Sequence, residues 1–102
     1  MTCNNTVTIW HYDEETGVYT LETHHCWAHG KTKIVKSENG MVKADECVIR
    51  IPTRDDIIAA KGDYIKTGTW SDVKPPKESC LEIAAIADNR IGSDPHWRID
   101  AI

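Results

Sequence analysis

The residues of this sequence that are richest in potential chemistry stand together as His24-His25-Cys26-Trp27-Ala28-His29. A zinc site needs four nitrogen or sulfur ligands, which commonly come from closely spaced pairs. The stretch contains no Cys-x-x-Cys pair, and on a strand His25 and His29 face one side while His24 and Cys26 face the other. Further ligands would have to come from distant parts of the chain. We therefore expect no metal or cofactor here and interpret the stretch as a half-exposed strand.

Nucleophilic catalysis needs a Cys or Ser beside a His base and a third group that orients the base. No local signature of that arrangement is present. The carboxylate pairs Glu14-Glu15 and Asp55-Asp56 stand at expected turn and helix-cap positions, where solvent surrounds them. The glycines are scattered among turns, so there is no phosphate-binding loop. We therefore expect no enzyme activity. The alternative hypothesis, if the protein is an enzyme, is a metal-dependent or thiol enzyme that uses residues His24–His29.

The four cysteines, Cys3, Cys26, Cys47 and Cys80, are widely spaced. An even number suits disulfides in a secreted chain, but the first residues lack the basic-then-apolar layout of a signal peptide. Three of the four lie within or beside apolar runs, where a free cysteine behaves as a small hydrophobic residue. We expect structural thiols and a reducing cytoplasm.

Composition places the chain among folded single domains. The 102 residues are 40% hydrophobic and 27% charged, which argues against disorder. No apolar run approaches the roughly 20 residues that span a bilayer, so we expect no membrane association. The net charge of −4 argues against a free-standing nucleic-acid binder, and Lys31, Lys33 and Lys36 are interpreted as a solvated strand face.

Short alternating or β-branched runs separated by turn residues predict a chain of strands. Gly17 favours a turn at residues 13–17, and Asn39-Gly40 favours a tight hairpin at residues 37–40. His29-Gly30 is expected to interrupt a strand. A helical turn is expected over 53–60, with Thr53 as its N-cap. The predicted strands cover residues 6–12, 18–28, 31–36, 46–51, 62–68, 81–87 and 97–101, and the stretch 41–44 is expected to resume the sheet.

This pattern predicts an all-β fold. Residues 1–102 are expected to form a single-domain small β-barrel or sandwich of about six to seven short strands, with at most one short helix. Trp10 and Trp27 lie in strands and are expected in the core or at the barrel mouth, and Trp97 on the final strand is expected in the core. Trp70 lies in the irregular loop 70–79, where it either covers the barrel end or contacts a partner.

Several short segments, taken in their order along a chain of this length, resemble segments of a known protein family. They are Thr8–Tyr12, Ile49–Pro52, Gly62–Gly68, the turn Ala87–Arg90 and the segment Pro95–Ile99 that follows it. In these pieces the chain resembles the small β-barrel proteins of the head–tail module of long-tailed bacteriophages. These are head-completion or stopper proteins and the minor capsid proteins encoded beside them. No catalytic motif comes with the resemblance.

The resemblance implies a structural virion protein at the phage head–tail junction. Such proteins form a ring between the portal–adaptor assembly and the tail, and a loop reaches the central channel to retain packaged DNA. The implied partners are virion proteins on the adaptor and tail sides and further copies in the ring, with non-specific proximity to DNA. The implied location is the virion, assembled in the bacterial host cytoplasm. The alternatives are a tail-completion or minor capsid protein, or a small β-barrel module that binds a peptide or a nucleic acid.

Two sets of residues become candidates under this hypothesis. Partner contact is assigned to the loop tryptophan and to the long polar turn 88–95, and the channel to segments 37–45 and 53–62. The interface candidates are Trp70, Asp88, Arg90 and Asp94. The channel candidates are Glu38, Asn39, Lys43, Arg54 and Lys61.

Overall fold

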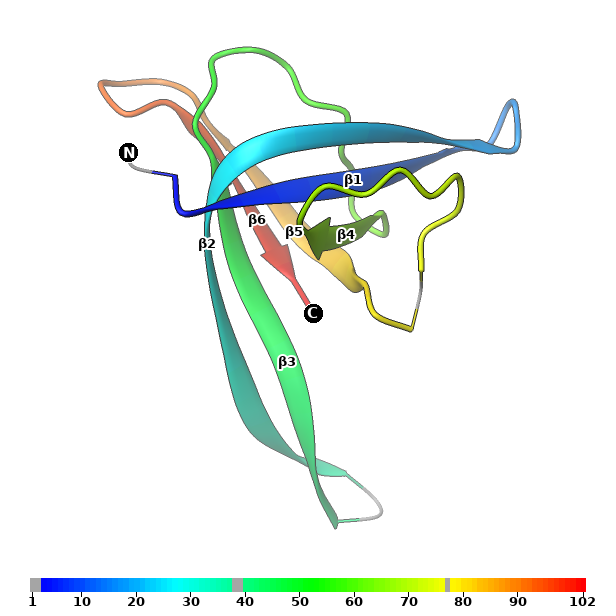
Figure 1. The fold of residues 1–102 in the computed structure, drawn as a ribbon. Helices are drawn as coiled ribbons and strands as arrows, with labels where there is room; N and C mark the ends of the chain where they lie inside the picture. Colours follow the sequence, from blue (N-terminus) through cyan, green and yellow to red (C-terminus); the bar gives the residue numbers. More distant parts are fainter. Residues whose placement is uncertain (1–2, 38–39, 77) are drawn as a thin grey trace.

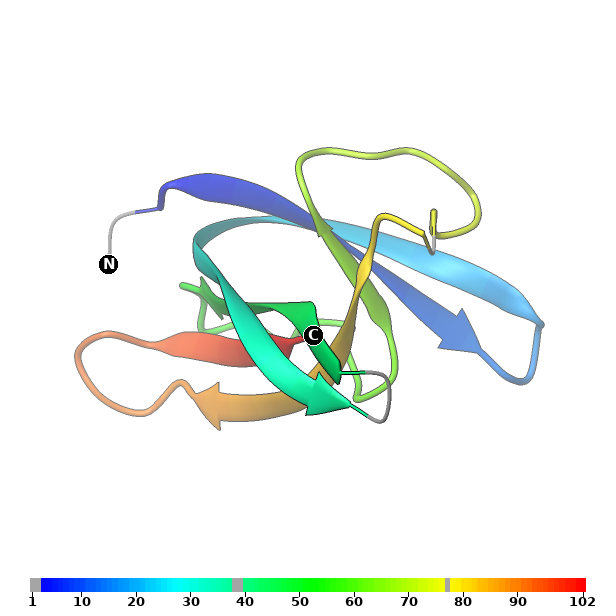
Figure 2. The ribbon, with the colours of Figure 1, turned by 90° about the horizontal axis from the view of Figure 1, so that it is seen from below.

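The structure is a computed structural model that describes residues 3–37, 40–76 and 78–102, with side chains described outside 31–45. It is a closed barrel in which every pair of neighbouring strands is antiparallel, in the order β1-β2-β3-β6-β5-β4. The strands are β1 (Asn5–Asp13), β2 (Val18–Ser37), β3 (Gly40–Ile51), β4 (Tyr64–Thr67), β5 (Leu81–Asn89) and β6 (His96–Ala101). Seen from below, they curve around a common centre (Figure 2). The predicted all-β single domain is confirmed, and the described residues contain no helix.

Strand β2 is one long strand where the sequence pattern predicted two. Its first half, to Cys26, pairs with β1, and its second half, from Trp27, pairs with β3. The predicted break at His29-Gly30 is wrong, because both residues stay in register with β3 and Gly30 pairs with Cys47. In the same way, the predicted stretches 41–44 and 46–51 form one strand, β3.

Two hairpins extend beyond the barrel (Figure 1). Residues 31–37 of β2 and 40–46 of β3 pair with each other, whereas β6 pairs with β3 only from Cys47 onward. Ser37 pairs with Gly40, so the hairpin connection stands where Asn-Gly predicted it. The other hairpin joins β1 to β2 through a turn in which Gly17 has a φ of 72°, and the predicted turn there is confirmed.

The barrel interior is filled by side chains from all six strands, as in other small barrels. They are Val7, Ile9, Cys26, Cys47, Ile49, Ile51, Ile65, Ile83, Ile99 and Ala101. All four cysteines are free, and those at 26 and 47 are buried as predicted. Trp10 is fully buried on the opposite side of β1, where its indole N–H donates to the carbonyl of Asp72 at 2.8 Å.

Residues 53–60 form an extended connection and not the predicted helical turn. Ile57 and Ala59 both pack against the core, which requires alternate residues to point inward and is incompatible with a helical turn. The hydroxyl of Thr53 accepts a bond from the N–H of Asp55 at 3.1 Å, so it closes a local turn. In Figure 1 this green segment arches over the end of the barrel opposite to the β2–β3 hairpin.

Candidate functional site

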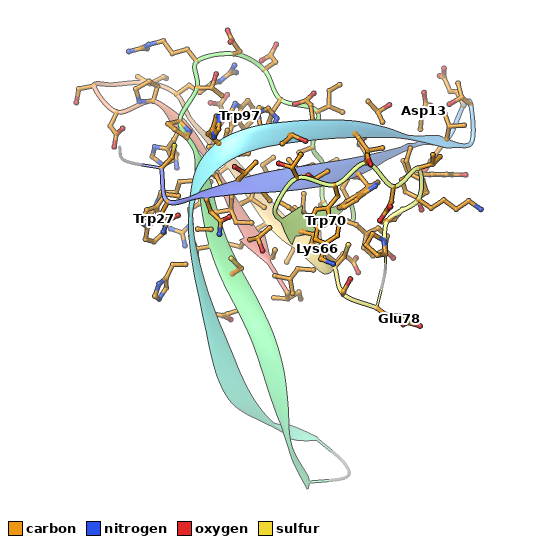
Figure 3. All side chains as sticks on the ribbon, viewed as in Figure 1. Asp13, Trp27, Lys66, Trp70, Glu78 and Trp97 are labelled. Atoms are coloured by element: carbon orange, nitrogen blue, oxygen red, sulfur yellow. The ribbon has the colours of Figure 1, made fainter. Side chains whose placement is uncertain are left out.

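The predicted interface residues do not form one surface. Asp88, Arg90 and Asp94 belong to the end of β5 and the connection to β6, whereas Trp70 follows β4. Figure 3 shows Trp70 beside Lys66 and away from Trp97, which lies on β6. A partner that contacts all four predicted residues would have to span both regions.

Arg90 holds a cluster of contacts within the protein. Its guanidinium lies 2.8 Å from Asp88 and 2.8 Å from Asp56, and it stacks over the ring of Trp97 at 4.5 Å from the centroid. These contacts tie the β5–β6 connection to segment 53–60. The hydrogen bonds from Arg90 hold the pKa of Asp88 below its usual value, and the same carboxylates, first Asp88 and then Asp56, raise the pKa of Arg90. We call this group the Arg90 clasp, and a docking role for it stays a prediction.

The described channel candidates belong to different elements of the fold. Arg54 is tied into the clasp region, because its guanidinium donates to the carbonyls of Arg90 and Gly92 at 3.4 and 3.2 Å. Lys61 is exposed at the turn before β4. Lys43 lies in β3 opposite Ile34 and therefore belongs to the projecting β2–β3 hairpin. Glu38 and Asn39 lie outside the described residues.

The histidine-rich stretch alternates as predicted. His24 Nε2 lies 2.5 Å from Oε1 of Glu22, which also accepts the N–H of Ile58 at 3.2 Å. On the other face, His29 stacks on Trp27 with ring centroids 5.9 Å apart, and the Arg50 guanidinium lies 4.8 Å from the Trp27 ring. Among the described residues, no three His, Cys, Asp or Glu side chains are grouped to hold a metal ion.

Sequence reasoning missed a buried carboxylate just before β4. Asp63 is buried, and its Oδ2 lies 2.7 Å from Nδ1 of His11 and accepts the N–H of Ala60 at 2.8 Å. This pair fastens the end of the 53–63 connection to β1. The only local signal was the polar residue after Gly62, which gives no indication of a partner 52 positions away in the chain.

Trp70 covers the outer surface of β1 and β4. Its indole N–H donates to the carbonyl of Thr67 at 2.8 Å, and its backbone N–H donates to the hydroxyl of the buried Thr8 at 3.2 Å. The ammonium of Lys66 lies 3.9 Å from the centroid of its ring. Gly68 has a φ of 105°, and a Cβ there would lie 2.9 Å from the Trp70 ring nitrogen. Trp70 is therefore a structural cover that stays 38% exposed.

A hollow of about 510 Å³ opens at the barrel mouth, where the β2–β3 hairpin leaves the barrel. We call it the mouth hollow. Its lining combines apolar side chains of the barrel interior with polar groups. The lining residues are Asn5, Ala28, Gly30, Glu46, Cys47, Ile49, Ile65, Lys66, Thr67, Ser79 and Leu81.

The fold defines the class of this protein as a closed six-stranded antiparallel β-barrel with a projecting hairpin. The chain belongs to DUF6751, a family of unknown function, and the family model matches residues 1–102. No curated protein and no solved structure matches the chain. Within residues 3–37, 40–76 and 78–102 there is no helix with the length and apolarity needed to cross a membrane.

Proposed function

We propose that this protein is a structural virion component at the head–tail junction of a long-tailed bacteriophage. Copies of it form a ring that joins the portal–adaptor assembly to the tail and helps to retain packaged DNA. The protein assembles in the bacterial host cytoplasm and stays in the virion. One observation carries the proposal, namely the hairpin of residues 31–46 that projects from a closed barrel.

The hairpin has the properties of an assembly element. A two-stranded hairpin is marginally stable by itself in water, and its outer edges can recruit a strand from a neighbouring molecule. A closed ring needs two different, mutually complementary patches on each subunit. The projecting hairpin and the barrel body are two different surfaces of one subunit, and we assign one patch to each.

The dimensions of the hairpin also suit a channel role. Seven residues of β2, 31–37, lie beyond the barrel, and at about 3.3 Å per residue they reach about 20 Å. The net negative charge, −4 for the whole chain, comes from residues outside this hairpin. The barrel body can therefore face DNA without gripping the phosphates, because tight phosphate binding needs cationic contacts.

Shortening the hairpin tests the proposal. Replacing residues 34–43 with Asn-Gly leaves Lys33 opposite Ala44 beside a two-residue turn of the kind that hairpins favour. We expect the isolated variant to fold, and particles that carry it to lose packaged DNA or to lack tails. The matched control replaces residues 14–17 at the tip of the β1–β2 hairpin with Asn-Gly and should assemble normally.

Mass spectrometry of purified particles gives the direct measurement. The protein should be present at the copy number of a ring, and its absence from the particles would refute the proposal. A map of the assembled neck separates this role from the alternative of a tail-completion or minor capsid protein. In that alternative the barrel would contact neither the adaptor nor the portal side.

A further inference from the structure

We infer that the free edge of β2 beside the mouth hollow is a docking site for an extended, acidic segment of another protein. The segment adds a strand along β2 and places an apolar side chain in the hollow. This inference goes beyond the proposed function, because it concerns the chemistry of one site and holds for a partner in any assembly.

The first observation is a side chain that imitates a strand. The amide group of Asn4 donates to the carbonyl of Ala28 at 3.1 Å and accepts the N–H of Ala28 at 2.8 Å. The backbone N–H of Asn4 also donates to the carbonyl of Cys26 at 3.1 Å. Asn4 therefore occupies the place of a peptide group in a strand paired with β2, and the polar groups of Ala28 point to the β1 side.

The geometry of a strand extends this edge beyond Ala28. Backbone polar groups of successive residues in an antiparallel strand point to alternate sides, so those of Gly30, Thr32, Ile34 and Lys36 also point to the β1 side. β1 itself begins at Asn5, opposite Cys26, and does not reach past it along β2. In the described part of the chain no strand pairs with residues 30–36 on that side, while β3 pairs with them on the other. Such an open row of N–H and C=O groups is a template for an added strand.

The second observation is the mouth hollow next to this edge. Ala28 and Gly30 of β2 both line it. The part of β2 that would pair with an incoming strand therefore has only small residues on the side of the hollow. A Cβ at Gly30 would meet its nearest atom, the carbonyl oxygen of Glu46, at 3.8 Å, which is ordinary contact. The missing side chain at Gly30 therefore leaves room that an apolar side chain of the partner can fill, over Ile49 and Ile65.

Charge indicates the chemistry of the partner. By sequence, the edge segment 30–36 contains three lysines and no acidic residue, and Lys66 is among the residues that line the hollow. The only acidic residue that lines the hollow, among those described, is Glu46, which already has an interaction within the protein. An edge with this charge favours a strand that alternates acidic and apolar residues, and opposite charges on paired strands are stabilising.

A labelled peptide tests the site on the full-length chain. The probe is a fluorescein-labelled peptide of Asp-Val repeated four times, and fluorescence anisotropy measures its affinity. The comparison peptide is Lys-Val repeated four times, which keeps the strand propensity and reverses the charge. We expect the acidic peptide to bind at least tenfold more tightly. Binding by both peptides alike, or by neither at millimolar concentration, overturns the inference.

Two variants locate the binding. Gly30→Leu adds a side chain whose Cβ makes only ordinary contact with the backbone and which occupies the mouth hollow, so it should weaken binding of the acidic peptide at least tenfold. His29→Leu adds the same side chain on the opposite face of β2 and should change the affinity less than twofold. Thermal unfolding confirms that both variants fold. Unchanged affinity in Gly30→Leu contradicts a site at the hollow.

Backbone exchange supplies a readout that does not depend on the variants. The amide of Gly30 should exchange rapidly in the free protein and slowly with the acidic peptide bound. If its exchange is already slow in the free protein and sedimentation shows a dimer, then the edge is occupied by a second copy, and an acidic partner segment is refuted. Presence in virions, which tests the proposed function, is a separate measurement.

Discussion

The buried carboxylate of Asp63 offers the sharpest test of how the 53–63 connection is held. Its Oδ2 is the shared acceptor for the N–H of Ala60 and for Nδ1 of His11. Asp63→Ala removes both bonds and leaves a backbone donor without its partner. Loss of the acceptor of this part-buried donor costs about 1–3 kcal/mol, and the His11 side chain, 34% exposed, can turn to water at a lower cost. We therefore expect a loss of about 2–3 kcal/mol in the free energy of unfolding.

The substitution Asp63→Asn separates hydrogen bonding from charge. Both bonds converge on one oxygen, so an amide oxygen in the same place keeps the bond from Ala60 and the contact with His11. We expect the Asn variant to lose less than about 1 kcal/mol, since a neutral hydrogen bond is weaker than a charge-assisted one by about that amount.

Urea unfolding followed by tryptophan fluorescence measures these differences. For a chain of this size, about 2–3 kcal/mol corresponds to a fall of roughly 10–20 °C in Tm. The control is Glu14→Ala in the exposed turn after β1, which should stay within about 0.5 kcal/mol. If Asp63→Ala costs no more than Asp63→Asn, then the two bonds do not hold the connection and this reasoning is wrong.

The clasp and the buried thiol give two further predictions. Because Arg90 lowers the pKa of Asp88 from its usual 3.8, the Asp88–Arg90 contact should persist as the pH falls through 3.8 and break only below it. The fluorescence of Trp97, over which Arg90 stacks, should report that step, and Arg90→Gln should abolish it. Burial raises the pKa of Cys26 from 9.0 to about 11, so the unfolded chain ionises this thiol first and stability should fall as the pH rises from 9 to 11. Urea unfolding of Cys26→Ala should show a smaller fall over that range, and an equal fall would contradict this role for Cys26.

Local patterns predicted most of the strands because their signals lie within a few residues. Alternation and β-branched residues located β1 and β6, and glycine marked the turn at residue 17. The predicted interruption at Gly30 failed for a long-range reason. Pairing with Cys47 on β3 holds Gly30 in the strand, and that pairing is invisible to a short window. The predicted helical turn at 53–60 failed because packing of Ile57 and Ala59 on the core requires an extended chain.

The candidate sites were less predictable than the strands. Arg90 and Asp88 were singled out as surface charges, and the structure joins them to Asp56, a residue 34 positions from Arg90. The Asn4 amide meets Ala28 across 24 positions. Neither contact has a local signature, because the side chains become neighbours only when the barrel closes.

By itself, the sequence determined a single all-β domain, the course of most strands, the hairpin connection before Gly40 and the burial of the thiols of Cys26 and Cys47. These features follow from side-chain periodicity and turn chemistry, which act over a few residues. The tertiary structure alone decided that β2 is shared by two partner strands, that a hairpin projects past the barrel, and that an open edge lies beside the mouth hollow. Those features depend on which strands pair and on where each pairing stops. Both are determined by contacts between distant residues, which form only when the whole chain closes into one barrel around one core.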